Sequence, residues 1–219
     1  MITRRKLNQL LATIDPPNYP DLVDFWNECE RVLIPRAKAL VKTRIKGQRK
    51  GIKAEPNYTH SLNVYKTVDK LHHWDYQDYN LFMAALLHDV VEDGGVSFEE
   101  LVQMGFPKKT IELVYLCTHD KRIKNHTARW LKLIDKLVDA DVDEAWLIKM
   151  IDLAENLKQS HGLSKENRKF MIEVKGPLIM RLTEKFNNWP WQNEYFYYLY
   201  HALELAKKKF DREGKKEEN

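Results

Sequence analysis

The sequence predicts an all-α fold, and three observations support that prediction. Apolar residues recur at helical spacing in nearly every segment of the 219-residue chain, whereas strand-like alternation is absent. Glycine and proline are few, with eight residues of each. The composition, 43% hydrophobic and 31% charged, is that of a globular chain large enough to bury its own core. We therefore expect one compact all-α domain that covers residues 1–219.

Helical periodicity gives the expected elements in their order along the chain. Pro35 should break or kink the second helix, and Gly94-Gly95 should end the fourth. Ser97 and Glu100 have the spacing of a capping box, which predicts that a new helix starts there. The helices are expected over residues 3–13, 21–44, 58–71, 78–91, from 97 onward, 107–118, 126–137, 141–159, 164–187 and 192–210.

A basic loop is expected over residues 45–57, between the second and third helices. A solvated surface loop is the usual structure of such a charge run. The loop gains functional interest because His60 follows it directly. The positive charges in and beside the loop are Arg44, Lys46, Arg49, Lys50 and Lys53.

The C-terminal region is rich in aromatic residues, seven of which fall between Trp189 and Tyr200. Because this cluster lies far along the chain from the ionisable residues described below, we expect it to pack in the core rather than to stack on bases. A groove for a partner helix is the alternative. The lysine-rich tail, residues 213–219, is expected to be disordered.

Charge and cysteine content limit the classes of partner. The formal charge of +4 is too small for a protein that binds duplex nucleic acid, but it suits a small anionic ligand held by a few basic side chains. The two cysteines form no CxxC pair, which is typical of the reducing cytoplasm. Neither a signal-peptide core nor an apolar run of roughly 20 residues is present. We expect a cytoplasmic protein with no membrane partner, and an oligomer is compatible with the sequence.

The most informative stretch is Met83–Gly95, where an apolar run leads directly into His88, Asp89, Glu92 and Asp93. On a helix the three carboxylates would share one face, with the imidazole about 100° away. Burying them beside an apolar run is costly, because charged groups lose water and like charges repel. A bound divalent cation would remove that cost. The alternative is the solvated acidic end of an amphipathic helix.

Three of the expected helices supply side chains that commonly ligate metal ions. Two imidazoles and two carboxylates form a mixed nitrogen–oxygen set, which favours Mn²⁺, Fe²⁺ or a similar ion over structural zinc. Such a set leaves positions for water and a substrate oxygen, and Glu92 and Asp93 could orient or deprotonate that water. Taken singly, each of these residues is more often an ordinary core or surface residue. The four candidate ligands are His60, His88, Asp89 and Asp152.

In this order the ligands resemble the H…HD…D signature of the HD-domain metal-dependent phosphohydrolases. His88–Asp93, HDVVED, is similar to the HDxxED signature of the hydrolase domain in RelA/SpoT homologues. Residues 47–60, with GQRK and YTH, resemble the basic loop and first metal histidine of that family. Thr118–Lys121 is similar to its TDDK turn, and Leu147–Leu157 to its LIKLAD…NL segment. The resemblance covers about residues 36–185, which we take as the core, with the N- and C-terminal helices packed on it.

The resemblance implies a compact HD-domain helical bundle with the metal site in a cleft between helices. One Mn²⁺ would be held by the four ligands, with Glu92 and Asp93 placing and activating the attacking water. Arg49 and Lys50 would contact the nucleotide base and phosphates, and Asn156 its sugar or a phosphate. The reaction of the family removes pyrophosphate from the 3′ position of guanosine tetra- or pentaphosphate (ppGpp or pppGpp), giving GDP or GTP. The chain resembles the small alarmone hydrolases that lack synthetase and regulatory domains.

The sequence departs from the family pattern near the expected nucleotide. The loop GQRK lacks one residue between Gln and Arg, and Gly94 stands where Thr is common. His119 replaces the first Asp of TDDK, and Leu153 replaces a basic residue after the last metal ligand. These departures leave open an HD phosphohydrolase for another phosphorylated nucleotide, such as NADPH or a nucleoside phosphate. The aromatic C-terminal cluster leaves open a non-catalytic nucleotide-binding or protein-interaction module.

Overall fold

The computed structural model is helical apart from short connections, and the all-α prediction is confirmed. Among the described residues, the only β-type pairing is an isolated bridge between Gln48 and Pro56. The structure describes residues 2–14, 22–49, 55–72, 78–188 and 192–217. Contacts group the chain into two compact units, Met1–Lys46 with Gln77–Ile148 and Gly47–Tyr76 with Lys149–Asn219. The single domain expected over 1–219 stays a prediction.

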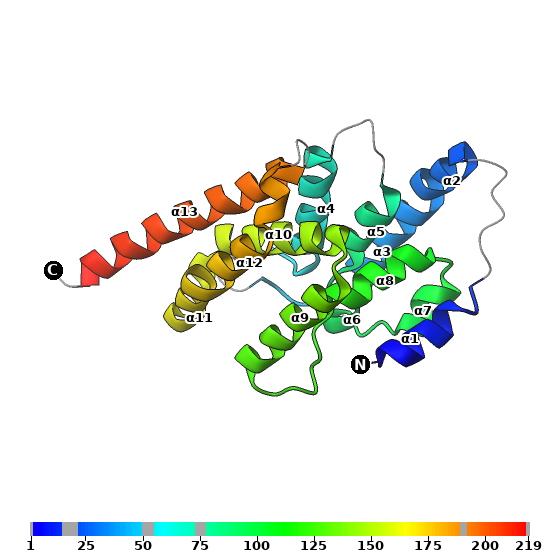
Figure 1. The fold of residues 1–219 in the computed structure, drawn as a ribbon, viewed down its shortest axis with the longest axis horizontal. Helices are drawn as coiled ribbons and strands as arrows, with labels where there is room; N and C mark the ends of the chain where they lie inside the picture. The colour runs from blue at the N-terminus through cyan, green and yellow to red at the C-terminus, as the bar shows by residue number, and fades with distance from the viewer. Residues whose placement is uncertain (1, 15–21, 50–54, 73–77, 189–191, 218–219) are drawn as a thin grey trace. The chain divides into compact units, whose positions relative to one another are not determined.

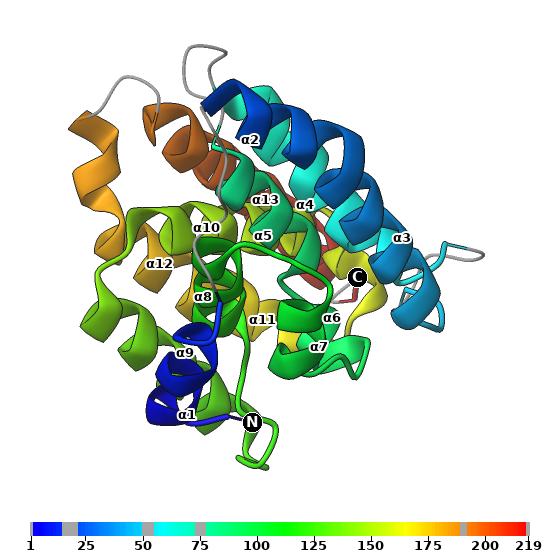
Figure 2. The ribbon, with the colours of Figure 1, turned by 90° about the vertical axis from the view of Figure 1, so that its right-hand side faces the viewer.

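The first unit is built around α5 (Tyr79–Leu87), which is buried along nearly its whole length. It packs against α3 and α8, as Figures 1 and 2 show. The apolar run that precedes the ionisable cluster in the sequence is therefore the core of this unit. The other helices of the unit are α1 (Arg4–Leu11), α2 (Leu22–Glu28), α3 (Ile34–Arg44), α6 (Val90–Asp93), α7 (Phe98–Gln103), α8 (Lys108–Cys117) and α9 (His126–Ala140), together with the first residues of α10 (Asp143–Lys158).

The helix expected over residues 21–44 is interrupted before Pro35. A π-helical turn, Cys29–Leu33, separates α2 from α3, and Pro35 lies in the first turn of α3. Proline has no N–H and its ring collides with the carbonyl group four residues earlier, so an α-helical register cannot continue through it. The wider π-helical turn makes room for the ring, which confirms the expected break.

The helix expected over residues 78–91 is shorter than predicted and ends at Leu87. His88 and Asp89 form a turn, and Val90 then starts the one-turn helix α6. Asp89 has φ −101° and ψ −4°, in the sparsely populated bridge region where functional residues often occur. The expectation that Asp89 and Glu92 share one face of a continuous helix is therefore wrong, because the helix is broken between the apolar run and the carboxylates.

The predicted capping box after this segment is confirmed. Ser97 accepts a hydrogen bond from the backbone N–H of Glu100, whose side chain accepts one from the N–H of Ser97. The reciprocal pair satisfies two of the unpaired N–H groups at the start of α7.

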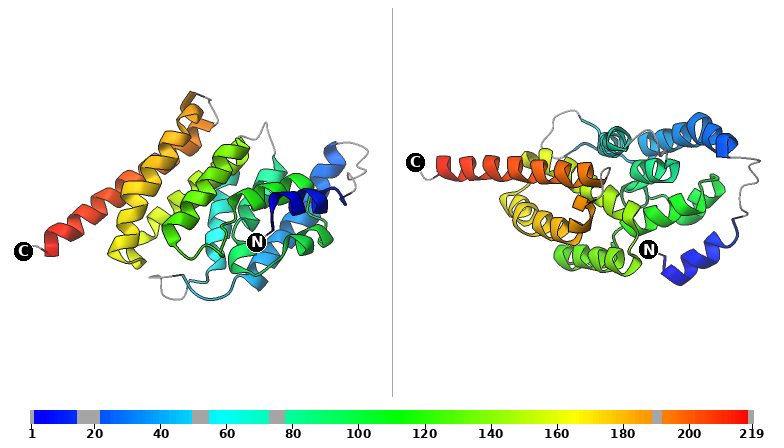
Figure 3. Two further views of the ribbon diagram at one scale, coloured as in Figure 1. Left: turned by 60° about the horizontal axis from the view of Figure 1, so that its bottom comes forward. Right: turned by 45° about the horizontal axis from the view of Figure 1, so that its top comes forward.

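The second unit contains α4, the rest of α10 and the C-terminal helices. Figure 3 shows α13 as its longest helix, and α12 packs against it. Tyr195 of α13 is fully buried and donates from its hydroxyl to the carbonyl of Val68 in α4 at 3.2 Å, whereas Tyr197 and Tyr200 are exposed. The aromatic cluster is thus partly core, as expected. The elements are α4 (Tyr58–Leu71), α11 (Lys165–Phe170), a π-helical turn (Met171–Lys175), α12 (Gly176–Leu182), a 3₁₀ turn (Glu184–Asn188) and α13 (Gln192–Glu217).

Helix α13 extends beyond its expected end near residue 210. It runs to Glu217, and 218–219 lie outside the described residues, so the disorder expected for 213–219 stays a prediction. An ion pair between Glu213 and Arg168 of α11 anchors this end of the helix. Among the described helices, none combines the length and apolar character needed to cross a membrane.

Candidate functional site

His60 and Asp152 form a buried pair in the second unit. His60 lies in α4 and Asp152 in α10, and the imidazole Nε2 is 2.9 Å from the carboxylate Oδ1. Both side chains are nearly inaccessible to water, at 5% and 10% relative exposure. Two predicted ligands that are 92 residues apart in the sequence therefore meet inside one unit.

Two further side chains of α10 hold Asp152. One turn before it, Lys149 donates from Nζ to Oδ2, and one turn after it, Asn156 donates from Nδ2 to Oδ1 at 2.7 Å. Lys149 is buried, so its ammonium group offsets the charge of the carboxylate within the protein. Sequence reasoning missed Lys149, although its i−3 spacing from Asp152 on a helix was a usable signal.

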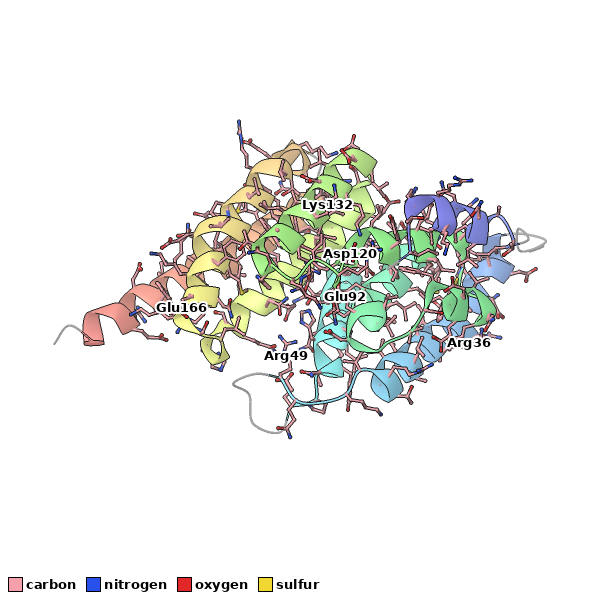
Figure 4. The ribbon with its side chains drawn as sticks, turned by 90° about the horizontal axis from the view of Figure 1, so that it is seen from below. Arg36, Arg49, Glu92, Asp120, Lys132 and Glu166 are labelled. Atoms are coloured by element: carbon pink, nitrogen blue, oxygen red, sulfur yellow. The ribbon has the colours of Figure 1, made fainter. Side chains whose placement is uncertain are left out.

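Arg49 belongs to the same network. Figure 4 labels it in the loop before α4, and its Nη2 donates to Oδ1 of Asn156 at 3.3 Å. A hydrogen bond of 2.9 Å from the backbone N–H of Arg49 to the carbonyl of Glu55 fixes the loop at this point. Asn156 therefore links the basic loop to Asp152. Lys50, the other predicted loop contact, lies outside the described residues, and its role stays a prediction.

His88 and Asp89 lie at the break between α5 and α6 in the first unit. Nδ1 of His88 is 2.8 Å from the carbonyl oxygen of Ala85, and a carbonyl group only accepts hydrogen bonds, so Nδ1 carries the proton. In the neutral form of this ring the lone pair is on Nε2, which lies 3.1 Å from Oδ2 of Asp89. This backbone contact fixes the tautomer that a ligating imidazole requires.

Glu92 and Asp93 occupy the single turn of α6 in different surroundings. The side chain of Glu92 is 11% exposed, whereas that of Asp93 is 56% exposed. Partial burial, followed by the negative charge of Asp89, raises the pKa of Asp93, while Lys121 at 3.1 Å opposes the rise. The two predicted water-activating residues are thus adjacent but chemically distinct.

The turn that follows α8 contacts both of these carboxylates. Figure 4 labels Glu92 in α6 and Asp120 in this turn. Both the backbone N–H and the ring Nδ1 of His119 hydrogen-bond to Oε1 of Glu92, the ring at 2.9 Å. Lys121 donates to the backbone carbonyl of Glu92 and pairs with Asp93. From the sequence, His119 was identified only as a departure from the family pattern, and these contacts were not predicted.

The donor chemistry of the predicted ligands fits a divalent ion. His60, His88 and Asp152 are buried and each offers one ligand atom, while Asp89 is 27% exposed. Each unit, taken by itself, contains one imidazole and one carboxylate of the predicted set. This mixed nitrogen–oxygen set, with the tautomer of His88 fixed, is suited to Mn²⁺ and chemically similar ions.

Comparison with known proteins identifies relatives of one kind. No protein-family model matches the chain. It is 28% identical over 190 residues to the guanosine-3′,5′-bis(diphosphate) 3′-pyrophosphohydrolase of Aquifex aeolicus, covering 84% of this chain and 26% of that protein. It is 27% identical over 184 residues to the bifunctional (p)ppGpp synthase/hydrolase SpoT of Escherichia coli K12, covering 80% and 24%. The chain thus spans about a quarter of the length of these curated relatives.

A solved structure of a metazoan orthologue of SpoT, described as hydrolysing ppGpp, has a similar fold. The TM-score is 0.55 at 23% sequence identity, and the match covers 90% of this chain and 97% of that one. The similarity in sequence and the similarity in fold agree, and both agree with the motifs noted above. The chain is therefore similar over most of its length to the hydrolases of the RelA/SpoT type, which confirms the resemblance that its motifs predicted.

Proposed function

We propose that this chain is a Mn²⁺-dependent hydrolase that removes the 3′-pyrophosphate from ppGpp or pppGpp, giving GDP or GTP and pyrophosphate. The observation that carries the proposal is the buried pair of His60 and Asp152, at 2.9 Å, because a buried imidazole–carboxylate pair is suited to ligate a metal ion. His88, with its lone pair on Nε2, and Asp89 would complete the ligand set. The related proteins support the choice of substrate, since each is named or described for ppGpp metabolism.

In this proposal each side chain has one task. When bound, Mn²⁺ supplies Lewis-acid polarisation of the 3′-phosphoryl oxygen and lowers the pKa of water. Glu92 orients the attacking water through its carboxylate, and Asp93, whose pKa is raised, accepts the proton of that water. Arg49 and Lys50 offset the negative charge of the 3′-pyrophosphate group, which is transferred to the water oxygen while the ribose 3′ oxygen leaves with GDP and takes up a proton. The charges of these side chains stabilise most where water is excluded.

Turnover by metal-stripped protein tests the proposal. The protein is supplied with Mn²⁺ and ppGpp, and pyrophosphate and GDP are quantified. Asp89→Asn is the blank for the metal site, and Glu92→Gln tests the catalytic pair. Release of both products that depends on Mn²⁺ and is lost in the blank supports the proposal. A Glu92→Gln/Asp93→Asn variant that turns over ppGpp as fast as the unaltered chain would remove the roles assigned to that pair.

A second candidate is hydrolysis of another phosphorylated nucleotide, and Leu153 favours it. This side chain is 5% exposed and lies where the family carries a basic residue, so a cation expected near the nucleotide is replaced by a buried apolar group. NADPH and a panel of nucleoside phosphates, assayed beside ppGpp, separate the two candidates. Phosphate release from another nucleotide with ppGpp intact would replace the substrate assignment and keep the metal site. Binding of ppGpp without turnover under any divalent ion would indicate a non-catalytic module.

We also infer a cytoplasmic location, which the two buried free cysteines support, because thiols persist in reducing compartments. Fractionation of cells that express the chain, followed by immunodetection, checks this inference.

A further inference from the structure

His119 holds Glu92 through two of its own nitrogen atoms. Its backbone N–H and its ring Nδ1 both contact Oε1 of Glu92, the ring nitrogen at 2.9 Å. An ionised carboxylate only accepts hydrogen bonds, so both nitrogens donate to the same oxygen. Because both contacts are made to Oε1, Oε2 is the oxygen that would contact the attacking water molecule.

The turn that carries His119 is itself fixed to its own unit. The residue before it, Thr118, is 2% exposed, and its hydroxyl donates to the carbonyl of Val114 at 2.7 Å. Lys136 of α9 donates from Nζ to the carbonyls of Tyr115 and Thr118, each at 2.6 Å. These hydrogen bonds hold the turn in place, and the turn holds the imidazole of His119 against Glu92.

An aspartate, which the TDDK turn carries at this position, could not donate this side-chain hydrogen bond to Glu92. An aspartate at position 119 has no side-chain proton to donate at neutral pH, and its charge would repel Glu92. At this position His119 therefore places a hydrogen-bond donor against Glu92, where an aspartate would place a second negative charge.

We propose that His119 is a positioning residue that fixes the Glu92 carboxylate for the attacking water, and this inference rests on the proposed function. His119 acts through Glu92 rather than on the substrate. Its effect should therefore fall on kcat, because a carboxylate held in the productive orientation pays no reorientation cost during the reaction. Binding of the nucleotide should depend on it little.

Three substitutions at one position separate the donor from the rest of the side chain. His119→Asn keeps a donor, since its amide Nδ2 can take the place of Nδ1, whereas His119→Asp and His119→Ala remove it. We expect kcat to fall about 10- to 100-fold in the Asp and Ala variants, with KM within about threefold. The Asn variant should stay within about threefold of the unaltered chain. Asp120→Asn, on the same turn, changes a carboxylate that hydrogen-bonds to Arg122; it is the matched control and should leave kcat unchanged.

A spectroscopic readout tests the contact independently of activity. Long-range ¹H–¹⁵N correlation spectra of the metal-free protein report which ring nitrogen of each of the eight histidines is protonated. The signal assigned to His119 by its loss in His119→Asn should show a protonated Nδ1. In Glu92→Ala it should move to the tautomer protonated on Nε2, which free imidazole side chains prefer.

The outcomes are distinct. The donor role would be overturned if all three variants had the kcat of the unaltered chain. It would also be overturned if kcat fell equally in the Asn and Asp variants while both unfolded at the same temperature as the unaltered chain. A His119 ring protonated on Nε2 in the unaltered chain would overturn the contact itself. If the unaltered chain leaves ppGpp intact, the proposed function fails, and the spectrum still decides whether His119 holds Glu92.

Discussion

Replacing Lys149 with methionine should destabilise the metal-free protein through a single buried charge. The ammonium group of Lys149 donates to Oδ2 of Asp152, and both side chains are 10% exposed or less. Removing one partner of a buried ion pair costs about 3–5 kcal/mol, because the remaining charge is left uncompensated. Asp152 keeps its contacts to His60 and Asn156, so we expect a loss of about 3 kcal/mol, at the lower end of that range.

A double-mutant cycle isolates the interaction. Lys149→Met, Asp152→Asn and the combined variant are unfolded in urea with EDTA present, and the free energies of unfolding are compared with that of the unaltered chain. Because the combined variant has neither charge, it should lose only about 1 kcal/mol relative to the unaltered chain. Lys158→Met, on the same helix, is the control. That lysine is 41% exposed, and we expect its loss to cost less than about 1 kcal/mol.

Metal ions provide a further arm of the same experiment. Saturating Mn²⁺ should restore part of the stability lost in Lys149→Met, because a cation on Asp152 compensates its charge. The reasoning would be refuted if Lys149→Met cost no more than the Lys158→Met control. It would also be refuted if the single losses at Lys149 and Asp152 simply added in the combined variant.

Three further predictions follow from separate features of the chain. Gly176→Ala should lower the free energy of unfolding by about 1–3 kcal/mol in urea, because the added Cβ would lie 2.7 Å from Cδ1 of Leu203. Burial raises the pKa of the Cys29 thiol to about 12, so the native chain should resist alkylation there at about pH 8 and react fully in urea, as peptide mapping would show. Arg122 lowers the pKa of Asp120 to about 2, below its unfolded value. The resulting stabilisation, less than about 1 kcal/mol, should be complete above about pH 4 and disappear as pH falls to about 2, so urea unfolding of Asp120→Asn and the unaltered chain should converge there.

The fold could be predicted from the sequence where local pattern alone decides it. The apolar run in α5 is buried from Leu81 to Leu87, so its periodicity and composition identified it correctly. The ends of helices were harder to predict from the sequence. Helix α13 continues past its expected end because Glu213 pairs with Arg168, a residue 45 positions away, and such a contact has no local signature.

The candidate site shows the same difference between what local sequence patterns predict and what contacts between distant residues decide. Residue types and order were enough to select His60 and Asp152 as partners before their contact was known. The contact between His119 and Glu92 joins a turn and a helix that are 27 residues apart, and only the path of the chain around α8 brings them together. Lys149 is the opposite case, since its spacing from Asp152 is local and could have been recognised as a pair.

The contacts around the carboxylates refine the physical argument for a metal. Burying the acidic cluster of His88–Asp93 was expected to be costly, and a bound cation would remove that cost. The structure shows that the protein supplies part of this compensation itself, through Lys121 at Asp93 and His119 at Glu92, and that Lys149 does the same at Asp152. The acidic groups are therefore held in place by the polypeptide before any ion binds. An ammonium group so close to Asp152 also repels a divalent cation, which weakens metal affinity while it keeps the carboxylate oriented. For the metal site proposed above, a lysine beside Asp152 would favour an exchangeable ion over a structural ion that holds the fold.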